Sequence, residues 1–167
     1  MGIEARRSLR HMAWANQQLY TAVQNLDDEA LSSYLTNPEW TVATILKHIL
    51  DGADWYVYCL TGANWHENPK PSTAREAKTL AVSLAEYDAA ILSESNKDDE
   101  LLAIQMEDGV VKHWRSTLIA QAIHHAAEHR AQLVAALEHH NYSSINLDDI
   151  DLWAFERWEN AQFEQGT

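Results

Sequence analysis

Helix-breaking residues are scarce in this chain, and their scarcity limits the folds that it can adopt. Only five glycines and three prolines occur in 167 residues. Because glycine and proline end helices and form the tight turns between short strands, long stretches without them favour long helices. Four long stretches carry apolar residues at helical spacing, at residues 4–25, 41–61, 73–95 and 116–140, and Gly52 is the single glycine or proline inside them. We therefore expect four amphipathic helices of about 20–25 residues.

Capping residues indicate where the second and third helices begin and end. Thr41 is predicted to be the N-cap, and Trp40 and Ile45 are spaced to pack together as a hydrophobic staple. Gly62 is placed to end the second helix. The run from Thr73 to Glu76 matches a capping box at the start of the third helix.

The segments outside the four helices are expected to decorate a helical bundle. Residues 102–106 and 110–114 flank Asp108-Gly109, a pattern typical of a β-hairpin closed by a two-residue turn. Residues 152–163 predict a short helix that docks through three aromatic residues, Trp153, Phe155 and Trp158. The sequence thus predicts a single all-α domain over residues 1–167, with a hairpin before its last long helix and a short C-terminal helix.

The charge and the cysteine content exclude several classes of function. Twelve Lys and Arg against twenty-five Asp and Glu give a net charge of −13, which opposes binding to nucleic acid. No apolar run approaches the roughly 18 residues that cross a membrane, and no signal segment follows the charged start. The single Cys59 permits no internal disulfide and no cysteine-based zinc site. We expect a soluble, cytoplasmic protein with no nucleic-acid or membrane partner.

Three of the nine histidines have the spacing of a metal site. His125 and His129 form the sequence His-x-x-x-His on the fourth helix, where positions four apart lie on the same face. His48 lies on a largely inward face of the second helix and supplies a third imidazole nitrogen. Three neutral nitrogens leave coordination positions open for water or substrate. Cys59 lies eleven residues beyond His48, roughly 16 Å along a helix, and is better explained as a buried apolar residue.

The same histidines also fit a simpler interpretation, because a single histidine or a histidine pair on a helix is often only a partly buried side chain. Two known metal motifs are absent. No histidine has a glutamate three residues before it, as ferritin-like di-iron bundles require, and no His-Glu-x-x-His motif occurs. The metal prediction therefore depends on His48, His125 and His129 meeting in space.

Polar neighbours of the pair are candidates for a role in chemistry. Gln121 and Gln132 flank His125 at about −40° and −20° around the helix, and Glu128 lies at about −60°. They are candidates to orient water or substrate or to support a ligand, although solvated surface side chains fit the same positions. Arg130 points away, and we expect a structural or subunit-interface role. Candidates for pocket walls are Trp14, Asn16, Tyr20, Trp55 and Tyr56, although aromatic residues at helical spacing more often pack in a core.

Four segments together resemble the DinB-like (damage-inducible) metalloprotein family, in the right order and over nearly the whole chain. They are residues 12–16 (MAWAN), 40–48 (WTVATILKH), 125–133 (HAAEHRAQL) and 151–155 (DLWAF). The resemblance implies a four-helix bundle of up-up-down-down connectivity, often a homodimer. It also implies a divalent metal, commonly zinc or nickel, held by His48, His125 and His129. Characterised relatives include transferases and isomerases that use low-molecular-weight thiols.

Two classes of function remain open at this point. The first is a metal-dependent enzyme, a thiol S-transferase or hydrolase that activates water or a low-molecular-weight thiol toward a small electrophilic substrate. The alternative is a non-catalytic, metal-stabilised bundle for ligand binding or stress response. A catalytic site keeps an open coordination position, whereas a structural site is closed by a fourth protein ligand. The sequence offers no obvious fourth ligand, which favours the open site.

Overall fold

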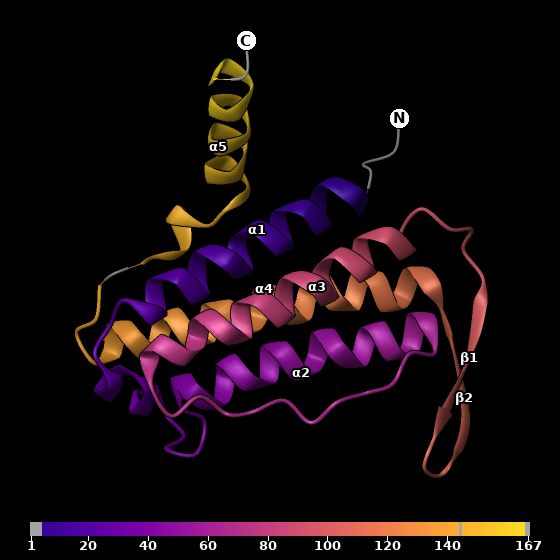
Figure 1. The fold of residues 1–167 in the computed structure, drawn as a ribbon, viewed down its shortest axis with the longest axis horizontal. Coiled ribbons are helices and arrows are strands. Elements are labelled where there is room, and N and C mark those ends of the chain that lie inside the picture. Colours follow the sequence, from indigo (N-terminus) through magenta and orange to yellow (C-terminus); the bar gives the residue numbers. More distant parts are fainter. Residues whose placement is uncertain (1–4, 144, 166–167) are drawn as a thin grey trace.

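The computed structural model describes residues 5–143 and 145–165, which form five α-helices and one β-hairpin (Figure 1). The long helices are α1 (Ala5–Gln24), α2 (Val42–Thr61), α3 (Ala77–Glu94), α4 (Arg115–His139) and α5 (Leu152–Gln165). The strands are β1 (Leu101–Met106) and β2 (Gly109–Trp114), and short 3₁₀ turns cover Asp28–Ser32, Ala74–Glu76 and Leu147–Asp149. The expected mostly helical protein with a small hairpin is confirmed. Among the described helices, none has the length and apolarity needed to cross a membrane.

Four of the helices pack around one apolar core. Both α1 and α2 pack against α3 and α4, so that each of these helices has two main neighbours. Large side chains from every one of them are fully buried, among them Leu19, Ile45, Leu84 and Leu133. The apolar residues that predicted the helices are therefore the residues that hold them together.

The helix directions differ from the expected up-up-down-down order. Arg6 at the start of α1 hydrogen-bonds Asn96 just beyond the end of α3, so these two helices are antiparallel. Trp40, just before α2, hydrogen-bonds Gln132 near the end of α4, so α2 and α4 are antiparallel as well. Figure 1 shows α2 and α3 running in the same direction, opposite to α1 and α4. The order is thus up-down-down-up, which corrects the sequence-based expectation.

The crossover segment, residues 62–73, makes this order possible. An extended chain rises about 3.3 Å per residue, so the segment can return along a 20-residue helix about 30 Å long. Two carboxylates of α2 hold it in place. Asp54 accepts a hydrogen bond from the backbone N–H of His66 at 2.8 Å, and Asp51 accepts one from the Asn68 amide at 3.2 Å. The crossover therefore follows the surface of α2.

The ends of α2 lie at the residues that the sequence predicted, and the turn of the hairpin lies one residue earlier than predicted. The Thr41 side chain accepts a hydrogen bond from the Thr44 backbone N–H, and Gly62 adopts a left-handed conformation with φ of 73°. The antiparallel strands pair Met106 with Gly109, so the two-residue turn is Glu107-Asp108 and not Asp108-Gly109. Gly109 still provides the unusual backbone, with φ of 131°, as the first residue of β2.

Helix α5 packs on α1 and projects from the bundle (Figure 1). Phe155 is only 1% exposed, and its ring lies near Trp14 and Trp158. Arg7 and Arg10 form ion pairs with the buried Glu159 at 2.9 and 2.5 Å. The expected aromatic contact of Phe155 and Trp158 is present, but Trp153 is 71% exposed and takes no part in it.

A chain of polar side chains crosses the middle of the core. Arg130 of α4 donates a hydrogen bond to the Asn16 side-chain oxygen at 2.8 Å, and the Asn16 amide donates to Asp88 of α3 at 2.9 Å. These residues are 5%, 1% and 2% exposed, respectively. The expected structural role of Arg130 agrees with this contact to α1. Burial raises the pKa of Asp88 to about 7, against the opposing effects of Asn16 and Arg130.

The raised pKa predicts that Asp88 makes the fold less stable as the pH rises. The folded state favours the protonated carboxyl. Its contribution to the free energy of unfolding is therefore complete below about pH 4 and is lost as the pH rises to about 7. The loss from this group is up to roughly 4 kcal/mol. Asp88→Asn should remove this part of the pH dependence, as measured by urea unfolding at pH 5 and pH 7.5. Equal pH dependence in the two proteins would contradict the assignment.

Candidate metal centre

The three histidines singled out in the sequence meet between α2 and α4. His48 comes from α2, and His125 and His129 come from successive turns of α4. Ring nitrogens of the three residues all lie within 4.8 Å of one another. Nε2 of His48 and Nε2 of His125 are 3.0 Å apart. The antiparallel packing of the two helices thus brings together residues that are 77 positions apart in the chain.

Gln132 fixes the orientation of His129. Its side-chain oxygen lies 2.9 Å from Nε1 of Trp40 and 2.9 Å from Nδ1 of His129. An indole nitrogen only donates hydrogen bonds, so the shared atom is an acceptor and His129 must donate from Nδ1. This arrangement leaves the lone pair of Nε2 free on His129, as a metal ligand requires. Of the three polar candidates, Gln132 is the one that contacts a histidine of the cluster.

The other two polar candidates lie outside the cluster. Gln121 is exposed and hydrogen-bonds the Tyr56 hydroxyl, whose ring packs at 5.8 Å from the ring of His125. Glu128 is exposed and makes no hydrogen bond or ion pair with another residue of the described chain. Cys59 is buried, and burial raises the pKa of its thiol to about 12, so the thiol stays protonated at neutral pH.

Burial favours the neutral form of two imidazoles of the cluster, those of His125 and His48. The pKa of His125 falls to about 4, first because the ring is desolvated and then because His129 and His48 lie close by. Desolvation followed by His129 also lowers the pKa of His48. At neutral pH these rings therefore present lone pairs and not positive charges, which suits a divalent cation.

Two residues shape the cluster in ways that the sequence analysis did not identify. A Cβ atom on Gly52 would lie 2.3 Å from Cε1 of His125, so only glycine leaves room for that ring. Trp40, expected only to pack as a staple, lies 5.0 Å from the ring of His48 and 5.7 Å from that of His129. The sequence did contain a signal for Gly52, because a glycine inside a predicted helix often has a packing reason.

The five predicted pocket-wall residues divide between the cluster and the core. Asn16 and Tyr56 line a small cavity beside His125. Tyr20 is fully buried and donates a hydrogen bond to the Leu46 carbonyl at 2.6 Å, which is a role in core packing. Trp14 packs against α5, and Trp55 lies next to Tyr56.

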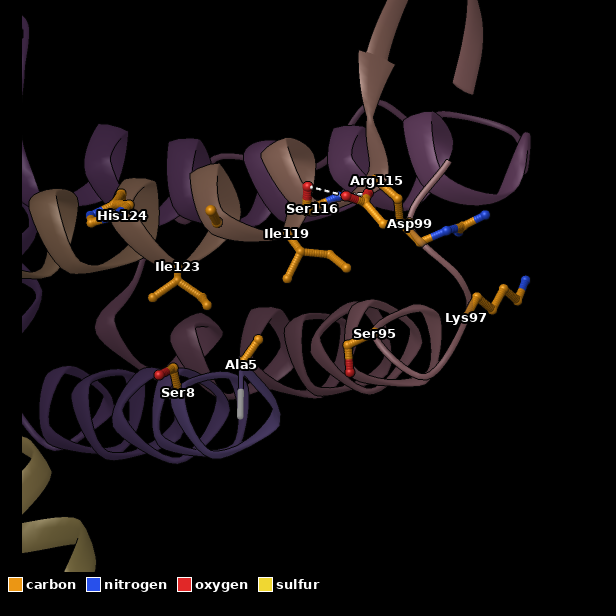
Figure 2. A pocket seen from close by; sticks show the side chains of 11 residues that line it. Ala5, Ser8, Ser95, Lys97, Asp99, Arg115, Ser116, Ile119, Ile123 and His124 are labelled. Carbon is orange, nitrogen blue, oxygen red and sulfur yellow. Dashed lines mark hydrogen bonds between the residues drawn. The ribbon is translucent and has the colours of Figure 1, made fainter. Parts of the chain in front are cut away.

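A larger hollow lies on another face of α4 and does not include the cluster (Figure 2). It has a volume of about 470 Å³ between the start of α1, the end of α3 and the start of α4. His124 lines this hollow and is not part of the three-histidine cluster. Arg115 in its wall is already paired with Glu94 and Glu100, and Asp99 accepts hydrogen bonds from Ser116. These contacts occupy the charged groups of Arg115 and Asp99, so neither group is free to bind a ligand in this hollow.

Comparison with models of protein families identifies a match over nearly the whole chain. The family model described as "DinB family" matches residues 1–160. No curated protein matches the chain.

The contact between Gly52 and His125 predicts a non-additive effect of mutation. Gly52→Ala should destabilise the protein or displace the ring, because overpacking costs about 1–3 kcal/mol. In a His125→Ala background the same change should stabilise α2 by up to about 1 kcal/mol, because alanine favours a helix more than glycine does. The free energy of unfolding of the four proteins, measured without metal, gives the coupling.

The sign change between the two backgrounds is the decisive result. If Gly52→Ala has the same effect with and without the His125 ring, the close contact does not exist in solution. The position of the ring signals of His125 in NMR spectra distinguishes displacement from destabilisation.

Proposed function

Because this chain belongs to the DinB family, we propose that it binds a divalent metal ion through His48, His125 and His129. The convergence of three ring nitrogens within 4.8 Å, from two helices, is the observation that carries the proposal. The donor set fits the ion: the rings of His48 and His125 have lowered pKa values, and Gln132 leaves a free lone pair on His129. Imidazole ligands suit zinc or nickel, the two metals that we expect.

We infer that the site is catalytic. No cysteine, carboxylate or fourth histidine among the described residues joins the three histidines, so positions remain for a substrate. A bound divalent ion lowers the pKa of a coordinated water or thiol and so supplies a nucleophile near neutral pH. The proposed reaction is transfer of water or a low-molecular-weight thiol to a small electrophilic molecule.

The surrounding side chains have definite tasks in this proposal. Gln132 holds the proton on Nδ1 of His129 and links that ring to Trp40. Trp40 packs against two of the three rings, those of His48 and His129. Burial raises the pKa of Tyr56 to about 12, so its hydroxyl keeps its proton beside His125. These groups orient the ligands and do not themselves supply the nucleophile.

The proposal extends to the assembly and location of the protein. We expect a homodimer, for which the exposed Trp153 and Phe163 of α5 offer an apolar surface. We expect a cytoplasmic protein, since its one cysteine is free and a reducing compartment suits it.

Metal content tests the ligand assignment. The purified protein should hold one zinc or nickel ion per chain by mass spectrometry of the metal. His48→Ala and His129→Ala should each weaken zinc binding by at least about 100-fold, because a three-ligand site loses one of its nitrogens. His124→Ala is the matched control on the same helix, and its affinity should stay within about twofold of wild type. Unchanged metal content in His48→Ala would reject the assignment.

Turnover separates the catalytic proposal from the alternative of a non-catalytic, metal-stabilised bundle. The zinc-loaded and nickel-loaded proteins should consume a small electrophile in the presence of a low-molecular-weight thiol or water, and His48→Ala should not. A protein that loses thermal stability on treatment with a chelator but shows no turnover with any thiol would support the alternative.

A further inference from the structure

Among the described residues, two buried side-chain atoms have no hydrogen-bond partner, Nε1 of Trp14 and Oδ1 of Asp88. Asp88 is 2% exposed, and its Oδ2 accepts the hydrogen bond from Asn16. Its Oδ1 is buried and has no hydrogen-bond partner in the described chain. Leaving such an oxygen unsatisfied costs about 1–3 kcal/mol, and more when it is charged. A buried group of this kind normally binds protein or an ordered water.

A small cavity lies beside this carboxyl. It has a volume of about 10 Å³, close to the minimum for one water molecule. Most of its wall is apolar, including Met12, Ile49 and Ile91. Its polar lining comes from Asn16, Asp88, Tyr56 and His125. A water needs two to four polar partners, and this wall supplies that number.

The cavity also reaches a histidine of the cluster that lacks support. Nε2 of His125 faces Nε2 of His48, which leaves Nδ1 as the other ring nitrogen. Gln132 supports His129 through Nδ1, but no described residue hydrogen-bonds Nδ1 of His125. Histidines that bind metals almost always donate this second N–H to a carboxylate, a carbonyl or a water. His125 and Asp88 thus line the same cavity, and each has one polar atom without a hydrogen-bond partner in the described chain.

We propose that this cavity holds one ordered water that accepts a hydrogen bond from Nδ1–H of His125 and donates one to Oδ1 of Asp88. Asp88 is then a positioning residue that orients the ring of His125 through the water. It lies on α3, whereas the three proposed metal ligands lie on α2 and α4. The chain from Arg130 through Asn16 holds the carboxyl in place, because each of its hydrogen bonds fixes the next side chain. The inference rests on the proposed metal site for its effect on affinity, but the water and the ring tautomer do not require metal.

The first test uses the metal-free protein. A high-resolution crystal structure should show one water within hydrogen-bond distance of Asp88 Oδ1 and His125 Nδ1. Nitrogen NMR should show the His125 proton on Nδ1 in the wild type and a mixture of tautomers in Asp88→Asn. An empty cavity, or a His125 tautomer that Asp88→Asn leaves unchanged, would overturn the inference.

The second test uses zinc alone as the probe. Asp88→Asn should weaken zinc binding by about 10–100-fold, the usual effect of removing an outer partner of a ligand. Asp54→Asn removes another fully buried carboxylate of the bundle, one that holds the crossover segment, and should leave zinc affinity within about threefold of wild type. Equal zinc affinity in Asp88→Asn and wild type would reject the inference. Failure of the wild type to bind zinc or nickel would reject the proposed function, and the first test would still decide the inference.

Discussion

The close approach of α2 to α4 is the contact on which the three-histidine cluster depends. Gly52 lets the two helix backbones come near enough for the ring of His125 to lie against α2. That approach sets the distance of 3.0 Å between Nε2 of His48 and Nε2 of His125. A larger residue at position 52 would separate the histidine of α2 from the two histidines of α4. A missing side chain therefore matters as much to this site as the histidines themselves.

Much of the fold and of the cluster could be predicted from the sequence, because both follow from local spacing. The scarcity of glycine and proline predicted the long helices, and the His-x-x-x-His spacing with an inward-facing His48 predicted which rings would meet. Helix direction could not be predicted in this way. It depends on the path of residues 62–73, which Asp51 and Asp54 hold against α2. Nothing in the sequence distinguishes these two carboxylates from other acidic residues on the surface of a helix.

Residues that act through a neighbour were the hardest to identify. Asn16 and Asp88 lie on separate helices, and nothing in the spacing of either indicates that they meet in the core. Gln132 was a candidate because it lies close to the histidine face, but its partner Trp40 is 92 positions away. Glu128 was a candidate for the same reason as Gln132 and proved to be exposed. Angular position on a helix predicts a shared face, but it does not predict which side chains of another helix complete the contact.

The parallel arrangement of α2 and α3 has a consequence for how this protein can diversify. The crossover segment lies along α2, where Trp65, His66 and Glu67 line a hollow together with Lys47 and Asp51 of that helix. Lys47 and Asp51 are one and three positions from His48 in the sequence. The bundle core does not depend on the identity of those exposed crossover residues. Changes in the length of this segment or in its exposed side chains would therefore alter the surface near the three-histidine cluster. The helices that carry the histidines would keep their packing. The segment that sets the topology thus carries exposed residues that can change without disturbing the helices that hold the histidines.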